Sequence, residues 1–238
     1  MAGLDPGARG EHAVAIASVR RGLVAVVTLV AGLGLLVEIP HHRPGAADWD
    51  EAVLLLSLSE EGNLPTWLAA SLLLSCAAAL GWVAAGERRA GGGLRWHWLA
   101  LALLFTYMSV DEAVGIHERL NDVVDLGGTA GGALTFSWIV PASLFVLVIA
   151  AAFLPLVRRL PAATRRRFLI AGAVYVGGAL VMEVPLGVYL EARGSDTLGY
   201  VVIDWVEETL ELTGAALFLL AVLRHAAAHH PALRLTDS

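Results

Sequence analysis

The sequence predicts an all-α fold: a polytopic membrane helix bundle of six transmembrane helices, with one short interfacial or re-entrant helix in its first outer loop. Two observations support this class. Of the 238 residues, 57% are hydrophobic and only 16% are charged, whereas a soluble domain carries about 25% charged residues. Long apolar stretches also recur along the chain. Because a bilayer-spanning helix needs roughly 20 apolar residues, the chain has room for about six of them.

The first apolar stretch is expected to be a retained transmembrane helix and not a signal peptide. Arg20 and Arg21 precede a long apolar run, 22–37, which continues into Glu38, Ile39 and Pro40. A cleavable signal peptide has a shorter apolar region that ends at a site of small residues. We therefore place the first span at about 20–40.

The remaining elements follow the hydropathy pattern in order. The Leu-rich region 48–59 is too short to cross a bilayer and is flanked by acids, so it is expected to lie at the interface or to re-enter the membrane. Further spans are expected at about 64–86, 94–118, 134–157, 168–191 and 200–225. The chain then divides into a mobile cytoplasmic N-terminus (1–18), a single six-span membrane domain (19–225) and a cytoplasmic tail (226–238).

The distribution of arginine predicts the orientation. Thirteen of the 16 Arg residues lie in the N-terminal flank, the 87–95 loop, the 158–167 loop and the C-terminal flank. The other three loops hold only Arg43, Arg119 and Arg193. Since cytoplasmic loops carry the excess of positive charge, both termini are expected in the cytoplasm, with the protein in the plasma (inner) membrane.

Several classes of chemistry are excluded by composition. The chain has no Lys, so it cannot form a lysine Schiff base with retinal or pyridoxal phosphate, and it has no P-loop lysine. A net charge of −6 without a basic tract argues against nucleic acid as a partner. The single Cys76 excludes an intrachain disulfide.

Carboxylates gather in the outer half of the expected bundle. At 1.5 Å of rise per residue, the acids of spans one, three, five and six all fall in this layer. On the sixth span, four acids share one helical face: Asp204, Glu207, Glu208 and Glu211. An ionised carboxylate facing lipid costs a few kcal/mol. These side chains are therefore expected to face the bundle interior or a water-filled cavity.

Too few basic residues share this layer to neutralise the acids, so protons or bound cations must do so. We expect a divalent metal ion, with ligands drawn from Glu38, Asp111, Glu112, His117, Glu118, Glu183, Glu208 and Glu211. An oxygen-rich set with little imidazole suits iron, manganese or calcium, and zinc can also bind. The pattern departs from known bundle metal sites: it has no Glu-x-x-His pair, and Asn121 stands where a zincin motif needs its second His.

Three function classes remain open on this pattern. A metal-activated water near the outer leaflet would make the protein a metal-dependent hydrolase or oxidoreductase that acts on a lipid or lipid-linked substrate, with no catalytic residue assigned. Alternatively, intramembrane acids and His build proton- or cation-coupled transporters and channels. The inner half lacks acids to complete such a route. The third class is a non-catalytic membrane assembly subunit.

Three motifs carry a resemblance. They are Glu61-Gly62-Asn63-Leu64-Pro65-Thr66-Trp67, Ser109-x-Asp111-Glu112-x4-His117-Glu118 and Glu207-Glu208-x-x-Glu211. Together they resemble a family of uncharacterised bacterial multi-spanning integral membrane proteins, over spans two to six. The resemblance implies a bacterial membrane location and, because that family has no known activity, no catalytic role for any residue.

Overall fold

The computed structural model describes residues 6–42, 50–117, 119, 132 and 135–229, and over these residues the chain is helical without strands. The helices are α1 (Pro6–His41), α2 (Asp50–Leu56), α3 (Leu64–Arg89), α4 (Arg95–Val114), α6 (Ile139–Arg159), α7 (Ala162–Val176), the π-helix η2 (Gly177–Met182), α8 (Glu183–Arg193) and α9 (Leu198–His229). The segments α7, η2 and α8 form one uninterrupted rod.

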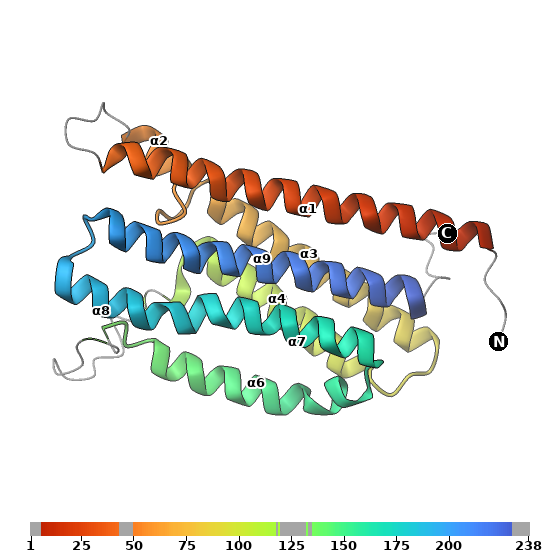
Figure 1. Cartoon of the computed structure of the whole chain (residues 1–238). Coiled ribbons are helices and arrows are strands. Elements are labelled where there is room, and N and C mark those ends of the chain that lie inside the picture. Colours follow the sequence, from red (N-terminus) through yellow and green to blue (C-terminus); the bar gives the residue numbers. More distant parts are fainter. Residues whose placement is uncertain (1–5, 43–49, 118, 120–131, 133–134, 230–238) are drawn as a thin grey trace.

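The long helices lie roughly parallel in one bundle, and successive ones run in opposite directions (Figure 1). α9 is the central element and contacts α1, α3, α7, η2 and α8. α3 and α4 form a tightly packed antiparallel hairpin. The short α2 lies against the end of α1 (Figure 1). This arrangement brings the C-terminal ends of α1, α4 and α8 and the N-terminal end of α9 to one end of the bundle.

Four helical stretches among the described residues are long and apolar enough to cross a membrane: Ile16–His41, Leu64–Arg89, Ile139–Arg159 and Ala162–Arg193. They correspond to the first, second, fourth and fifth expected spans. α4 and α9 lie beside them in the bundle (Figure 1), at the positions of the third and sixth expected spans. α1 begins at Pro6, so the helix starts before the first expected span and includes much of the segment 1–18 that was expected to be a mobile N-terminus.

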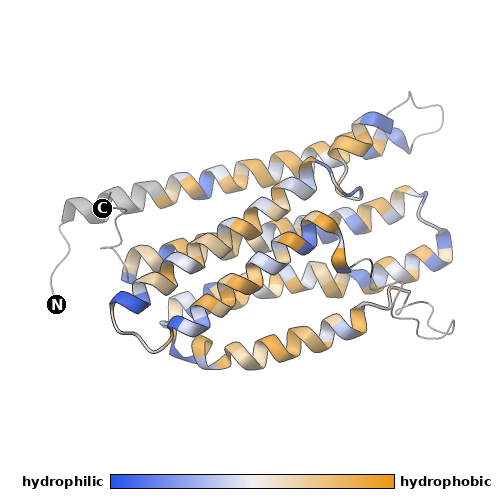
Figure 2. Cartoon of the chain, turned by 180° about the vertical axis from the view of Figure 1, so that it is seen from behind, coloured by the Kyte–Doolittle hydropathy of each residue, from blue (hydrophilic) through white to orange (hydrophobic). Residues whose placement is uncertain are grey.

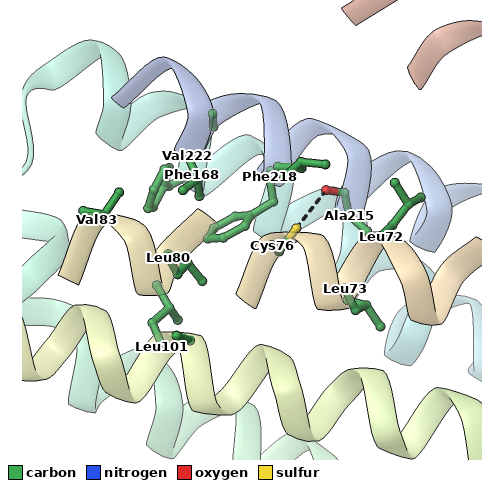
Figure 3. Packing of buried hydrophobic residues seen from close by; sticks show 14 of the residues in the cluster. Leu72, Leu73, Cys76, Leu80, Val83, Leu101, Phe168, Ala215, Phe218 and Val222 are labelled. Carbon is green, nitrogen blue, oxygen red and sulfur yellow. Dashed lines mark hydrogen bonds between the residues drawn. The ribbon is translucent and has the colours of Figure 1, made fainter. Parts of the chain in front are cut away.

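Aromatic and aliphatic side chains from α3, α4, α7 and α9 interlock to form the core (Figure 3). The Phe218 ring lies 4.7 Å from the Phe168 ring and is stacked on Phe105 at 4.6 Å between ring centroids. The buried Cys76 thiol donates to the Ala215 carbonyl over 3.5 Å. This contact fixes α3 against α9 where both helices are apolar.

The helices are hydrophobic along most of their length, and hydrophilic residues are concentrated towards the helix ends (Figure 2). Exposed large side chains include Leu103 on α4, Leu147 on α6 and Leu169 on α7. In water such a surface would cost free energy in proportion to its area. In a bilayer it is the expected lipid-facing surface.

The π-helix η2 is the middle segment of the rod, between α7 and α8. Pro185 has no backbone N–H and therefore cannot donate to the Val181 carbonyl four residues earlier, which loosens the helix at this point. Wider π turns are the usual accommodation and frequently occur at functional sites. Gly178 within η2 approaches α9 so closely that a Cβ there would lie 2.7 Å from the Glu207 carbonyl oxygen.

The connection from α2 to α3 packs into the bundle. Ser57 and Leu58 follow α2 and are buried. Asn63 then caps α3: its Oδ1 accepts a hydrogen bond from the Thr66 amide at 3.1 Å, and its Nδ2 donates to the Ser57 carbonyl at 2.7 Å. One asparagine thus fixes both the start of α3 and the buried turn before it.

Candidate functional site

Acidic side chains from α4, α8 and α9 meet at one end of the bundle, which we call the acidic end. Glu211 on α9 interacts electrostatically with Glu112 on α4 and with Glu183, the first residue of α8. Three helices that are distant in sequence therefore contribute to one group. We name this group the carboxylate centre; it comprises Asp111, Glu112, His117, Glu183, Glu207, Glu208 and Glu211.

On the α4 side, Asp111 holds His117 by two contacts. Asp111 Oδ1 accepts a hydrogen bond from the His117 amide at 2.9 Å, and Oδ2 lies 3.1 Å from the ring Nδ1. The chain can turn back in this way because α4 ends at Gly115, which adopts φ 60°, a left-handed conformation that glycine adopts without strain. The two contacts orient the imidazole towards the centre.

Asp111 also favours a proton on His117. Its Oδ2 lies 3.1 Å from the ring Nδ1, and a carboxylate so close stabilises the cationic form of the imidazole. The cationic imidazole would have to lose a proton before it could bind a metal ion, because only neutral imidazole is a ligand.

Trp138 joins His117 to α8. Its ring lies 5.2 Å from the His117 ring, between centroids, and its Nε1 donates to Glu183 Oε1 at 3.1 Å. Glu183 is buried at the start of α8, immediately after the π-helix. One wall of the carboxylate centre is thus formed by four side chains in a row: Asp111, His117, Trp138 and Glu183.

α9 forms the opposite wall. Glu208 interacts electrostatically with Glu112 and with the other acids of its own helix. Glu211 interacts with Glu112 and His117, and the Tyr175 hydroxyl of α7 donates a hydrogen bond to it. Glu208 and Glu211 therefore face the carboxylates of α4.

Glu207 is buried among other acids of the centre. Its side chain is only 6% exposed, and its Oε2 atom is buried without a hydrogen-bond partner among the described residues. The charges that act most strongly on it are those of Glu183, Glu211 and Asp204, all negative. A buried carboxylate in such surroundings must bind a proton or a cation, since an isolated buried charge is strongly unfavourable.

Glu38, which the sequence analysis includes among the expected ligands, lies beside a separate group of polar side chains on α1 and α2. It is 4% exposed and accepts a hydrogen bond from the buried Ser57 hydroxyl. His42 Nδ1 lies 3.4 Å from Glu38 Oε2. Asp204 connects this group to the carboxylate centre, because it interacts electrostatically with Glu38 and also with Glu207.

The expected ligands therefore divide in three. Asp111, Glu112, His117, Glu183, Glu208 and Glu211 share the carboxylate centre; Glu38 lies next to it; Glu118 lies outside the described residues. Within the part of the chain that the structure describes, no group of three or more His, Cys, Asp or Glu side chains is arranged to hold a metal ion. Bringing ligands onto one ion would thus require side-chain rotation.

Three polar participants were not among the expected site residues: Ser57, Trp138 and Tyr175. The hydrogen bond from Trp138 to Glu183 depends on how α6 meets α8. Tyr175 is on α7, and its hydrogen-bond partner Glu211 is on α9. Sequence spacing carries no signal for either contact.

Comparison with known proteins identifies the family of the chain but indicates no activity. No curated protein and no solved structure matches the chain. A family model described as a domain of unknown function, DUF8692, matches residues 21–226, which include every helix of the bundle at least in large part. The chain therefore belongs to the DUF8692 family.

Proposed function

We propose that the protein is an integral membrane protein that binds a divalent metal ion at the carboxylate centre. The observation that carries this proposal is Glu207, a buried carboxylate with an unpartnered oxygen among the described residues, next to three further carboxylates. Neighbouring like charges repel strongly in a low dielectric. A single divalent cation bound between these carboxylates would compensate their negative charge and remove the repulsion.

The balance of charge at the centre supports a cation. Glu207 and Glu208 are acted on most strongly by other carboxylates. The positive charge that reaches Glu211 is that of His117, which is already paired with Asp111. The single positive charge of one imidazolium cannot compensate the negative charges of the several acids that α9 alone contributes.

The chemistry of the donors limits which metal would bind. Oxygen ligands dominate and His117 offers one nitrogen, which suits iron, manganese or calcium, with zinc as a further choice. A water bound to such an ion becomes acidic enough to act as a nucleophile near neutral pH. Because the centre lies near one end of an apolar bundle, a lipid or lipid-linked molecule is the substrate class that such chemistry would serve.

The proposal includes a topology. α4 and α9 would cross the membrane together with the four apolar rods, giving six spans. The Arg-rich end, where α3 ends and α4 begins, would face the cytoplasm by the positive-inside rule. The carboxylate centre would then lie in the outer half of a bacterial inner membrane.

Elemental analysis of the detergent-purified protein tests the proposal. We expect about one divalent ion per chain in the unaltered protein and in Glu51→Gln, which removes an exposed carboxylate from α2. We expect none in Glu208→Gln, because the amide keeps the shape of the side chain and loses the negative charge. Equal metal content in all three proteins, or none in the unaltered protein, would contradict metal binding at this centre.

A second candidate is proton-coupled transport, favoured by one observation. Asp204 interacts electrostatically with both Glu38 and Glu207, so interacting carboxylates extend from the α1–α2 side of the bundle towards α4. Intramembrane acids arranged in this way can pass protons. In that case Asp111→Asn and Glu208→Gln would leave the protein equally or more stable, and chelators would have no effect.

A further inference from the structure

A cavity of about 530 Å³ lies at the Arg-rich end of the bundle, far along the helices from the carboxylate centre. It is lined by Gly81, Ala84, Ala85 and Arg88 of α3 and by Arg95, Trp96 and Leu99 of α4. Its volume falls within the range of small-molecule sites, about 300–1,000 Å³. The cavity thus occupies the outer side of the α3–α4 hairpin, next to the turn that joins the two helices.

Small residues create the cavity. A Cβ added at Gly81 would have no atom within 4 Å, and Ala84 and Ala85 supply only methyl groups. Larger side chains at these three positions would fill the space between the helices. The hollow is therefore a consequence of the sequence of α3 and not of a gap in the core, where Leu80 and Val83 of the same helix are fully buried.

Two guanidinium groups flank the cavity. Among the described residues, neither Arg88 nor Arg95 makes an ion pair with a carboxylate. Arg95 instead lies over the Trp96 ring at 5.0 Å. The acid nearest in sequence, Glu87, lies against Gly92 in the turn and does not line the cavity. The cavity therefore has two positive charges available for an anion.

The rest of the lining is apolar and open to the surroundings of the bundle. The Trp96 side chain is 64% exposed and Leu99 is 38% exposed. A free phosphate ion would gain nothing from these surfaces. A ligand with a phosphate group and an attached hydrocarbon chain would use both parts, and basic pockets between membrane helices bind anionic lipid head groups in this way.

We propose that this cavity binds one anionic phospholipid, with its phosphate between Arg88 and Arg95 and the start of an acyl chain against Trp96 and Leu99. Arg is suited to this role because its planar fork donates two hydrogen bonds to phosphate oxygens. The site does not depend on the proposed metal, since its residues are all on α3 and α4 at the end opposite the carboxylate centre.

Native mass spectrometry of the full-length protein in a neutral detergent tests the proposal, with phosphatidylglycerol as the probe. We expect one tightly retained phosphatidylglycerol per chain. Arg88→Gln with Arg95→Gln should weaken this binding about thirtyfold. The control, Arg158→Gln with Arg159→Gln, removes two exposed charges at the same end without touching the cavity and should leave the affinity unchanged.

Gly81→Leu provides a second test that keeps every charge, because its side chain fills the cavity. It should prevent retention of the lipid while the circular dichroism spectrum stays helical. Phosphatidylcholine and inorganic phosphate should not displace phosphatidylglycerol. Equal loss of binding in the control pair, equal retention of phosphatidylcholine, or unchanged binding in Gly81→Leu would each overturn the proposal.

Discussion

At the scale of single residues, Trp138 connects His117 to Glu183 within one wall of the carboxylate centre. Its indole N–H satisfies one oxygen of Glu183, and its ring contacts the imidazole that Asp111 orients. A buried carboxylate oxygen that loses its donor leaves a desolvated charge without compensation. Trp138 is therefore important for the stability of the centre even though it cannot bind a metal ion.

We expect Trp138→Phe to lower the free energy of unfolding by about 1–3 kcal/mol, because the phenyl ring keeps the packing and removes the donor. Thermal unfolding in detergent, followed by circular dichroism, measures this change. Trp67→Phe is the control, since Trp67 is 66% exposed and its replacement should have little effect. A loss of equal size in both variants would show that the hydrogen bond to Glu183 is unimportant.

Glu207→Gln should act in the opposite direction in the metal-free protein. The amide removes one negative charge facing Glu183, Glu211 and Asp204, and it can donate a hydrogen bond to a neighbouring carboxylate. We expect a higher melting temperature than that of the unaltered protein when both are measured in chelator. A lower melting temperature would mean that the Glu207 carboxylate is already satisfied as an anion.

The sequence predicts part of this residue-level picture. The four acids of α9 share a face at helical spacing, so their common direction could be predicted. The positions of Trp138, Tyr175 and Ser57 could not, because each makes a contact with another helix. The same holds for the contacts among Glu38, Ser57 and His42. They depend on how the turn after α2 packs into the bundle, and the hydropathy pattern of the sequence does not predict that packing.

At the scale of elements, the π-helix η2 sets how closely the rod of α7 and α8 approaches α9. A Cβ at Gly178 would lie 2.7 Å from the Glu207 carbonyl oxygen and 2.8 Å from Glu211 Cγ. The missing side chain therefore permits the contact that places Glu183 and Tyr175 beside the acids of α9. In the sequence, Pro185 predicts a weakened helix near this position. Where the π turns form depends on the close contact between Gly178 and α9, which the sequence does not predict.

We expect Gly178→Ala to destabilise the protein by about 1–3 kcal/mol, as overpacking of a close helix contact does. Gly172→Ala is a matched control on the same rod, because a Cβ there meets no atom within 4 Å. That change should be neutral or stabilising by up to about 1 kcal/mol. Comparing the two melting temperatures tests the contact, and a stable Gly178→Ala protein would contradict it.

At the scale of the whole molecule, charge is separated along the bundle. Arg224 of α9 lies within electrostatic range of Arg167 of α7 and Arg20 of α1, so the basic residues of three distant segments meet at one end. The carboxylate centre lies towards the other end. The sequence predicts this separation from residue counts and helix lengths alone, whereas which helices touch and which remain exposed to lipid depends on side-chain packing.

Reporter fusions test the orientation. Fusions at Arg88 should give the cytoplasmic signal, because this end carries the excess of Arg. A fusion at Ser195, in the turn between α8 and α9, should give the external signal. The reverse pattern would place the carboxylate centre in the inner half of the membrane and would contradict a site that acts near the outer leaflet.

The most direct test of the central claim is the melting temperature of the purified protein with and without a chelator. A metal ion that binds only the folded state stabilises it by about 2.7 kcal/mol at 100 times its Kd, which corresponds to a shift of about 5–10 °C for a chain of this size. We predict that EDTA lowers the melting temperature by this amount and that the correct ion restores it. Asp111→Asn and Glu208→Gln should not respond. An unaltered protein that ignores EDTA, contains no metal, and becomes more stable with both substitutions would contradict metal binding.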